Sequence, residues 1–279
     1  MSALVTVGGL VMLVVYYVDL SRFFGAGKAG QGELFKVCLT VVGGIGALIA
    51  LYYSARRVRT MEKGNVDTRF NNAVGHLGSD NATVVQGGIH ALHQIAVGNR
   101  EYTRVVHNLF CSFLRENSAK LYEGIDFDTT PDKCPVIIQA LIDYLFRPYN
   151  GKESVYKDFP ADLSFGTFIN CKFMNLSLNN TCFSRCNLKK CYFYETELNE
   201  CKFVGTTLIK CGFAKTMLNK CNFMGATLEE CCTWGNAILE CCCFAGTTLN
   251  KCNLDNSKNI NTNFQEAILN DTVLPLNEK

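Results

Sequence analysis

Residues 191–230 read CYFYETELNE CKFVGTTLIK CGFAKTMLNK CNFMGATLEE, and this stretch decides the fold of the C-terminal half. Every fifth residue is Leu or Phe, and the rule holds over fourteen consecutive sites from Leu163 to Leu228. A period of five matches neither an α-helix, at 3.6 residues per turn, nor a flat strand, at 2.0. We therefore expect the chain to turn a corner every five residues and to stack its turns into a solenoid.

A second pattern lies inside the first, because the residue two positions before each Leu or Phe is small, except at Leu176. From Cys191 on, Cys-x-Phe alternates with Thr-x-Leu or Ala-x-Leu. Residues 161–274 thus resemble the pentapeptide-repeat proteins, whose loose repeat is Ala-(Asp/Asn)-Leu-x-x, although Cys often takes the small position here. The resemblance implies a right-handed quadrilateral β-helix with four pentapeptides per coil. Phe and Cys then line two facing walls, and Leu and Thr line the other two.

The five-residue register slips by one after Leu228, since the next clean site is Leu239. Either Thr233 holds the corner and the extra residue forms a bulge within 234–236, where Gly and Asn suit one, or Trp234 fills the corner itself. We prefer the first, because a Trp is too large for a site lined by Leu and Phe. Trp234 would then lie in the bulge.

Three aromatic residues are the candidate partner-binding residues of the solenoid. Trp234 is the only tryptophan, and it either plugs the bulge from inside or turns outward as an anchor for a partner. Tyr192 and Tyr194 flank the inward Phe193 and are expected to point outward, where they would extend such a surface.

The 16 cysteines would suggest disulfides in a small secreted chain, but their positions argue against this. Nine fall on the inward small site, which predicts reduced thiols in a reducing compartment. These nine are Cys171, Cys186, Cys191, Cys201, Cys211, Cys221, Cys232, Cys242 and Cys252. Cys182, Cys231, Cys241 and Cys243 fall outside that site; they lack a second pair of ligands at zinc-site spacing, so no metal is predicted.

Two charge-free runs, residues 3–18 and 37–53, are each about as long as the shortest membrane-spanning helices. No basic residue precedes the first run and no Ala-x-Ala site closes it, so a transmembrane hairpin is preferred to a signal peptide. Basic residues and the reduced cysteines predict that both termini and the solenoid lie on the cytoplasmic side of the membrane, which in a bacterium is the inner membrane. Gly43, Ala47 and Ala50 share one face of the second span and would allow close helix packing, within the hairpin or between subunits.

Helical spacing of apolar residues predicts four amphipathic helices, around residues 70–77, 85–96, 106–113 and 137–145. Asp80 is expected to cap the second and Asn99 the third. The helices should cover the open first coil, whose strand edges are otherwise unpaired. The stretch from Arg69 to Ala96 resembles the segment before the repeats in bacterial membrane-anchored pentapeptide-repeat proteins, through the matching LGS and GGI-x-AL-x-x-IA. No activity is carried over with it.

No signature of an enzyme is present, and no catalytic residue or cofactor is predicted. His90 and His93 share a polar helix face and could begin a metal site with His107, but a solvated face or an interface is preferred.

The sequence thus predicts a membrane hairpin (1–55), a basic linker (56–65), a helical domain (66–150) and a β-helix (151–279). Three functions fit these features. The first is a membrane-tethered scaffold that binds a protein partner. The second is an effector, for example in phage defence, that damages the bilayer when its membrane spans oligomerise, and the third is a DNA mimic that shields topoisomerases. Residues 161–279 hold eleven basic and eleven acidic residues, so the acidic surface that mimicry needs is missing, and no nucleic acid is expected to bind.

Overall fold

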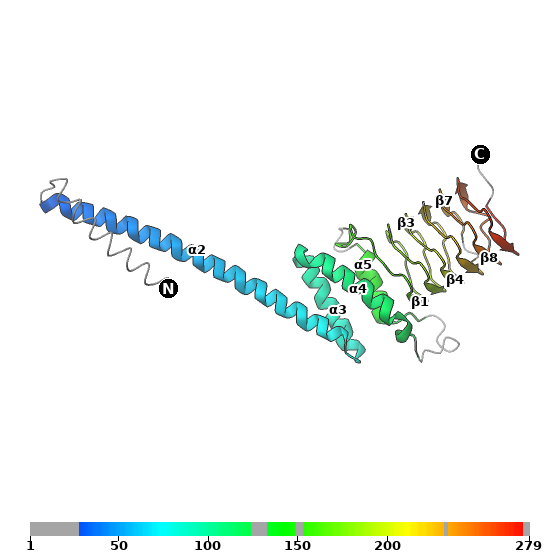
Figure 1. Cartoon of the computed structure of the whole chain (residues 1–279), viewed down its shortest axis with the longest axis horizontal. Coiled ribbons are helices and arrows are strands. Elements are labelled where there is room, and N and C mark those ends of the chain that lie inside the picture. Colours follow the sequence, from blue (N-terminus) through cyan, green and yellow to red (C-terminus); the bar gives the residue numbers. More distant parts are fainter. Residues whose placement is uncertain (1–27, 124–132, 149–152, 232–233, 276–279) are drawn as a thin grey trace. The chain divides into compact units, whose positions relative to one another are not determined.

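The computed structural model describes residues 28–123, 133–148, 153–231 and 234–275 of the 279. By its contacts the chain divides into two units, residues 1–67 and 68–279, which are described separately. Helix α2 (Lys28–Leu77) is one continuous helix of 50 residues that runs through both (Figure 1). The predicted linker at 56–65 and the predicted helix at 70–77 are therefore parts of α2 and not separate elements.

The first unit contains the predicted membrane hairpin. Its first run, residues 3–18, lies outside the described residues. The second run lies in α2, where Val41, Ile45, Leu48 and Leu51 are exposed, as are Gly43, Ala47 and Ala50. Within the described ranges, no helix is both long enough and apolar enough to cross a membrane.

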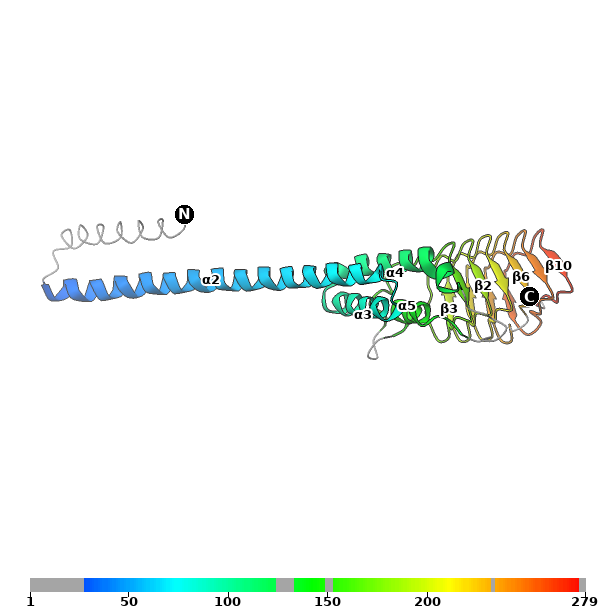
Figure 2. The same ribbon diagram turned by 90° about the horizontal axis from the view of Figure 1, so that it is seen from below.

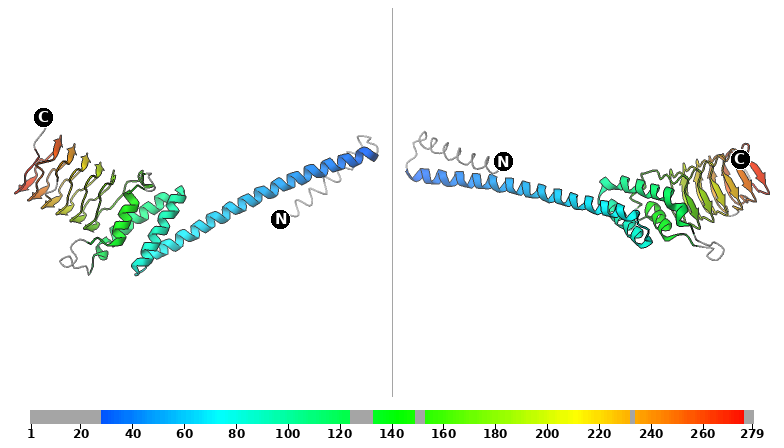
Figure 3. Two further views of the ribbon diagram at one scale, coloured as in Figure 1. Left: turned by 180° about the vertical axis from the view of Figure 1, so that it is seen from behind. Right: turned by 60° about the horizontal axis from the view of Figure 1, so that its bottom comes forward.

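The helical part of the second unit consists of α3 (Ala82–Gly98), α4 (Arg100–Leu121) and α5 (Val136–Phe146), together with the end of α2. Their apolar stripes meet in a core that includes the fully buried Leu92, Phe110 and Leu141. Asn81, and not the predicted Asp80, caps α3, because its side chain accepts a hydrogen bond from Thr83 N at 2.9 Å. In Figure 3 these helices lie together at one end of the solenoid.

In the described residues, the solenoid contains ten strands of three residues, joined by tight corners. The strands are β1 (Thr167–Ile169), β2 (Asn187–Lys189), β3 (Glu197–Asn199), β4 (Thr207–Ile209), β5 (Met217–Asn219), β6 (Thr227–Glu229), β7 (Ile238–Glu240), β8 (Thr248–Asn250), β9 (Lys258–Ile260) and β10 (Ile268–Asn270). They form two parallel sheets, β1-β2-β4-β6-β8-β10 and β3-β5-β7-β9 (Figure 2). Partners such as Leu188 and Leu208 are 20 residues apart, which fixes four pentapeptides per coil.

The two sheets are the Leu walls, and stacked aromatic rings fill the two walls between them. Phe173, Phe193 and Phe213 stack with ring centroids 4.8 Å apart, and Phe183, Phe203 and Phe223 stack at 5.1 and 4.5 Å. The two stacks touch edge to face across the core, as Phe183 and Phe193 do at 6.0 Å. The predicted alternation of Phe and Leu walls is confirmed.

Corner residues explain how the period of five arises. Among the described residues, the residue two places after nearly every inward Leu or Phe has a positive φ, for example 57° at Arg185, 53° at Glu195 and 56° at Lys215. A residue in the left-handed conformation turns the chain at the corner, so that the next pentapeptide lies at an angle to the last. Because Lys, Glu and Asn occupy these sites more often than Gly, the corners are held by the stacked coils and not by residue preference.

The register slip is resolved differently from the prediction. Trp234 is fully buried and takes the inward site of the next coil, stacked 4.3 Å from Phe213. Cys231 is buried at the small site, and its Sγ donates to Leu208 O at 3.5 Å. Two residues, 232 and 233, lie between the small and large sites here instead of one; Cys232, predicted to point inward, lies outside the described residues. The bulge expected within 234–236 was wrong, and so was the placement of Cys231 outside the inward site.

Candidate interaction surface and its support

Each pentapeptide presents three outward positions, which are the residues on either side of the large inward side chain and the corner residue. On the wall of Phe193 and Phe213, the outward neighbours in one coil are Tyr192 and Tyr194, and those of the next coil are Gly212 and Ala214. Tyr192 is 44% exposed, whereas Gly212, which pairs with it in the next coil, is buried. We call these four residues the tyrosine patch.

The second tyrosine of the patch is held in place. Lys215 Nζ donates a hydrogen bond to Tyr194 Oη at 2.6 Å and lies 5.0 Å from the centre of its ring. The same ammonium forms an ion pair with Glu195 at 3.1 Å. The hydrogen bond to Tyr194 and the pairing with Glu195 raise the pKa of Lys215, and the hydrogen bond from Lys215 lowers the pKa of Glu195. Tyr194 is thus half-buried and fixed, whereas Tyr192 is available to a partner.

Trp234 does not contribute to this surface. Its ring is 0% exposed, and its Nε1 donates to Cys231 O at 2.8 Å. The hypothesis that it turns outward as an anchor is wrong, and the alternative that it packs inside is confirmed. Sequence reasoning missed Gly212 and Ala214, although their signal was present as two small outward residues 20 positions after the tyrosines.

A cleft of about 570 Å³ opens beside the patch, between the helical part and the first coils. One side is formed by residues between 145 and 148 and between 153 and 159, with the rings of Phe146 and Phe159, and the other by residues between 175 and 197, which include Glu195 and Glu197. Glu195, the corner residue that follows Tyr194, lines this cleft, so the cleft adjoins the tyrosine patch.

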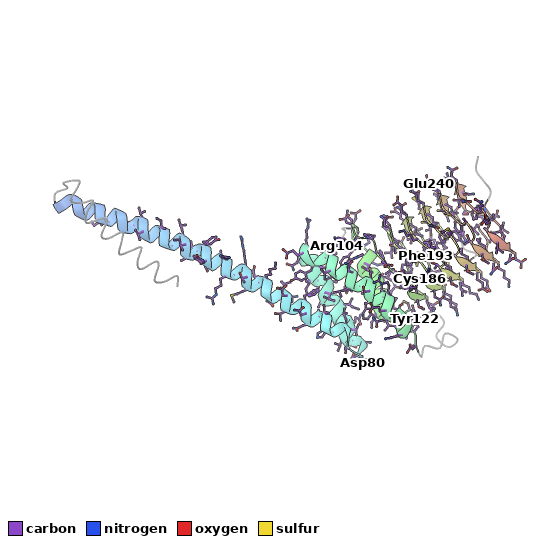
Figure 4. The ribbon with its side chains drawn as sticks, in the orientation of Figure 1. Asp80, Arg104, Tyr122, Cys186, Phe193 and Glu240 are labelled. Atoms are coloured by element: carbon purple, nitrogen blue, oxygen red, sulfur yellow. The ribbon has the colours of Figure 1, made fainter. Side chains whose placement is uncertain are left out.

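Helices next to this surface provide hydrogen-bond partners for backbone groups at the open edge of the first coil. Tyr122 Oη accepts a hydrogen bond from Ile169 N at 2.7 Å and donates one to Ile169 O at 2.9 Å. Likewise, the side chain of Gln139 accepts a hydrogen bond from Lys172 N and donates one to Lys172 O, both at 2.9 Å. These side chains replace the backbone groups of a missing preceding coil, so α4 and α5 close the end of the solenoid. Figure 4 shows Tyr122 at the end of α4 that faces the coils.

Arg115 adds a charged contact to the same junction. Its guanidinium lies 2.5 Å from an Asp162 oxygen, and Ser164 N donates to the same carboxylate at 3.1 Å. Burial works against ionisation of Asp162, but the hydrogen bonds from Ser164 and the charge of Arg115 outweigh it and lower the pKa of that carboxyl group.

The three histidines lie in the helical part, where His90 is exposed, as predicted for a solvated face, but His93 is not. His93 is buried and stacks on Tyr144 with ring centroids 4.3 Å apart, and Tyr156 Oη lies 3.3 Å from its Nδ1. Burial, with a smaller contribution from the charge of His90, lowers the pKa of His93 to about 4. His107 is buried as well, and burial lowers its pKa too. No group of three or more His, Cys, Asp or Glu side chains in the described ranges could hold a metal ion.

The described cysteines are free thiols, and most of those in the repeats point inward. Their sulfurs donate to a carbonyl of the preceding coil, as Cys201 does to Leu178 O at 2.8 Å and Cys221 to Leu198 O at 3.0 Å. Burial raises the pKa of the Cys186 thiol to about 12. These thiols therefore act as small apolar side chains with one weak hydrogen bond each.

Comparison with known proteins identifies the repeat. Residues 191–229 match the family model for pentapeptide repeats in 8 copies. No curated protein matches the chain. The C-terminal part of the protein is a pentapeptide-repeat β-solenoid, preceded by an α-helical region.

Solved structures with similar coils include a trypsin-treated QnrB1, a plasmid-mediated fluoroquinolone resistance protein, at 22% identity and a TM-score of 0.32; the match covers 41% of this chain and 58% of that one. Rfr23 from the cyanobacterium Cyanothece 51142 has 17% identity and a TM-score of 0.31, over 39% of this chain and 90% of its own. HetL, involved in heterocyst differentiation regulation in the cyanobacterium Nostoc sp. strain PCC 7120, has 18% identity and a TM-score of 0.19, over 41% and 62%.

Proposed function

We propose that this protein is a non-enzymatic interaction scaffold whose solenoid binds a protein partner through the tyrosine patch and the adjoining cleft. The observation that carries the proposal is the exposed ring of Tyr192 beside Gly212, on a wall backed by fully buried Phe193 and Phe213. An aromatic side chain on a rigid surface loses little conformational entropy when a partner covers it, and such residues are enriched in binding hot spots.

The proposal is tested by comparing two surface variants of the full chain. Tyr192→Glu places a charge in the patch, and Met224→Glu places the same charge at an exposed apolar residue on a different wall. Proteins captured by the wild type and by the Met224 variant, but lost from the Tyr192 variant, would be partners of the patch. Equal recovery by all three proteins would refute binding at this surface.

Attachment to a membrane is a separate part of the proposal. It is supported by the exposed apolar side chains of α2 between Val41 and Tyr53 and by the charge-free run at residues 3–18. We place the protein at a bacterial inner membrane with the solenoid in the cytoplasm. The full chain should then stay in membranes washed with alkaline carbonate, and protease added outside intact cells should leave the solenoid uncut. Release by carbonate would refute the anchor, and cleavage would refute the orientation.

A second candidate is the membrane effector, which the exposed face of Gly43, Ala47 and Ala50 favours, because small residues permit close contact between helices of two copies. An effector depolarises cells when overexpressed, and Gly43→Leu should abolish that effect. A scaffold leaves the membrane potential unchanged in both cases.

A further inference from the structure

One pair of thiols differs from the others in the solenoid. Cys134 lies two residues before α5, and Cys171 occupies an inward small site of the first coil. Their Sγ atoms are 3.1 Å apart, and Tyr122 Oη lies 3.3 Å from the sulfur of Cys171 and 3.8 Å from that of Cys134. The two sulfurs are in contact where the helical part meets the solenoid, at the place where Tyr122 donates a hydrogen bond to the backbone of the coil.

The pair is accessible from one side. Cys171 is fully buried, but Cys134 is only partly buried and lines a cleft of about 370 Å³. Lys133, Lys172 and Asp143 line the same cleft, so its charged side chains carry a net charge of +1, which favours approach of an anionic thiol reagent. Most of the other inward thiols, such as Cys201, Cys211 and Cys221, are buried within the stacked coils.

We propose that Cys134 and Cys171 form a reversible disulfide bond that joins the start of α5 to the first coil when a low-molecular-weight disulfide such as oxidised glutathione is present. The sulfurs need only close from 3.1 Å to the bonded distance of about 2.05 Å, which small side-chain rotations can supply. The bond would lock the helices that cover the end of the solenoid in place.

The exchange balances in two steps. The thiolate of Cys134 attacks oxidised glutathione, forms a mixed disulfide and releases one glutathione thiolate. The thiolate of Cys171 then attacks the sulfur of Cys134 and releases the second. Two protein thiols are oxidised, one oxidised glutathione is reduced to two molecules of glutathione, and the protons of the two thiols pass to the released thiolates.

The rate of the first step should depend on pH. The hydrogen bond with Cys171 and burial raise the pKa of the Cys134 thiol, so little thiolate is present near neutral pH. We therefore expect the disulfide to form slowly at pH 7 and faster at higher pH. The equilibrium position, and not the rate, is the quantity to measure.

The test uses the full chain, equilibrated in glutathione buffers of rising oxidised-to-reduced ratio, quenched with acid and alkylated. Trypsin cuts after Lys133, Lys157 and Lys172, so each cysteine falls in a peptide that contains no other cysteine. We expect a linked peptide pair, with the mass of the two peptides less two hydrogen atoms, to replace both alkylated peptides together. Thermal unfolding of the oxidised protein should also begin at a higher temperature than that of the reduced protein.

Two variants complete the experiment. Cys134→Ala should lose the linked pair and the difference in unfolding temperature, whereas Cys182→Ala, which removes another partly exposed thiol, should keep both. The proposal is overturned if Cys134 stays alkylated at oxidising ratios that modify Cys182. It is equally overturned if Cys134 is recovered only as a mixed disulfide with glutathione, because Cys171 would then not be a partner.

Discussion

Replacing Trp234 with Ala should be among the most damaging single changes in the solenoid. The ring is fully buried, stacks on Phe213 at a centroid distance of 4.3 Å and meets Phe244 edge to face at 6.4 Å. Truncation of a buried aromatic ring to Ala costs about 3–5 kcal/mol. Cys231 O also loses its 2.8 Å bond from the indole, which is worth about 1 kcal/mol. We expect Trp234→Ala to lower the free energy of unfolding by about 4 kcal/mol.

The assay is equilibrium unfolding of the full chain in urea, followed by circular dichroism. Trp234→Phe is the matched control: Phe fills this site in the neighbouring coils, so the stack survives, and the loss should be about 1 kcal/mol, mainly the hydrogen bond. Tyr192→Ala, on the surface, should change stability by about 0.5 kcal/mol or less. A Trp234→Ala protein as stable as the Tyr192 variant would refute the inward placement. Because Trp234 is the only tryptophan, blue-shifted fluorescence that acrylamide does not quench gives an independent check.

Three further predictions concern the junction, the repeat and pH. Tyr122→Phe leaves Ile169 N without its hydrogen-bond partner and should lower the free energy of unfolding by about 1–3 kcal/mol in urea titration. Cys211→Ser should lower the free energy of unfolding by only about 1 kcal/mol, because the new hydroxyl can donate to Leu188 O, which now accepts a hydrogen bond from the thiol. Thiol counting under denaturing conditions should find the other repeat cysteines reduced, and disulfide pairing of most of them would contradict the structure. The lowered pKa of His93 means that the stability gained from keeping it neutral is fully present above pH 6.5 and is lost as pH falls from 6.5 through about 4, by about 3 kcal/mol. His107 acts in the same direction, so the dependence of the unfolding free energy on pH should be shallower in His93→Gln than in the wild type, and identical slopes would contradict the assignment.

The sequence alone determined which residues of the repeat point inward. The positions of Phe193, Leu198 and their equivalents follow from the period of five, because a regular coil brings each fifth side chain to the same place on its wall. The helices around residues 85–96, 106–113 and 137–145 followed from apolar spacing for the same reason, and the structure gives them as α3, α4 and α5. The position of Asn99 at the start of α4 also followed from the sequence, since helix boundaries are local features, although its side chain makes no capping hydrogen bond.

Only the tertiary structure decided the features that depend on a neighbouring coil or on the junction. Trp234 looked too large for an inward site, but stacking on Phe213 in the coil before gives its ring a place. Tyr192 lies beside Gly212, which is 20 residues away in sequence. Cys134 and Cys171 meet because α5 covers the first coil. Such contacts join segments far apart in the chain, and no local period records them.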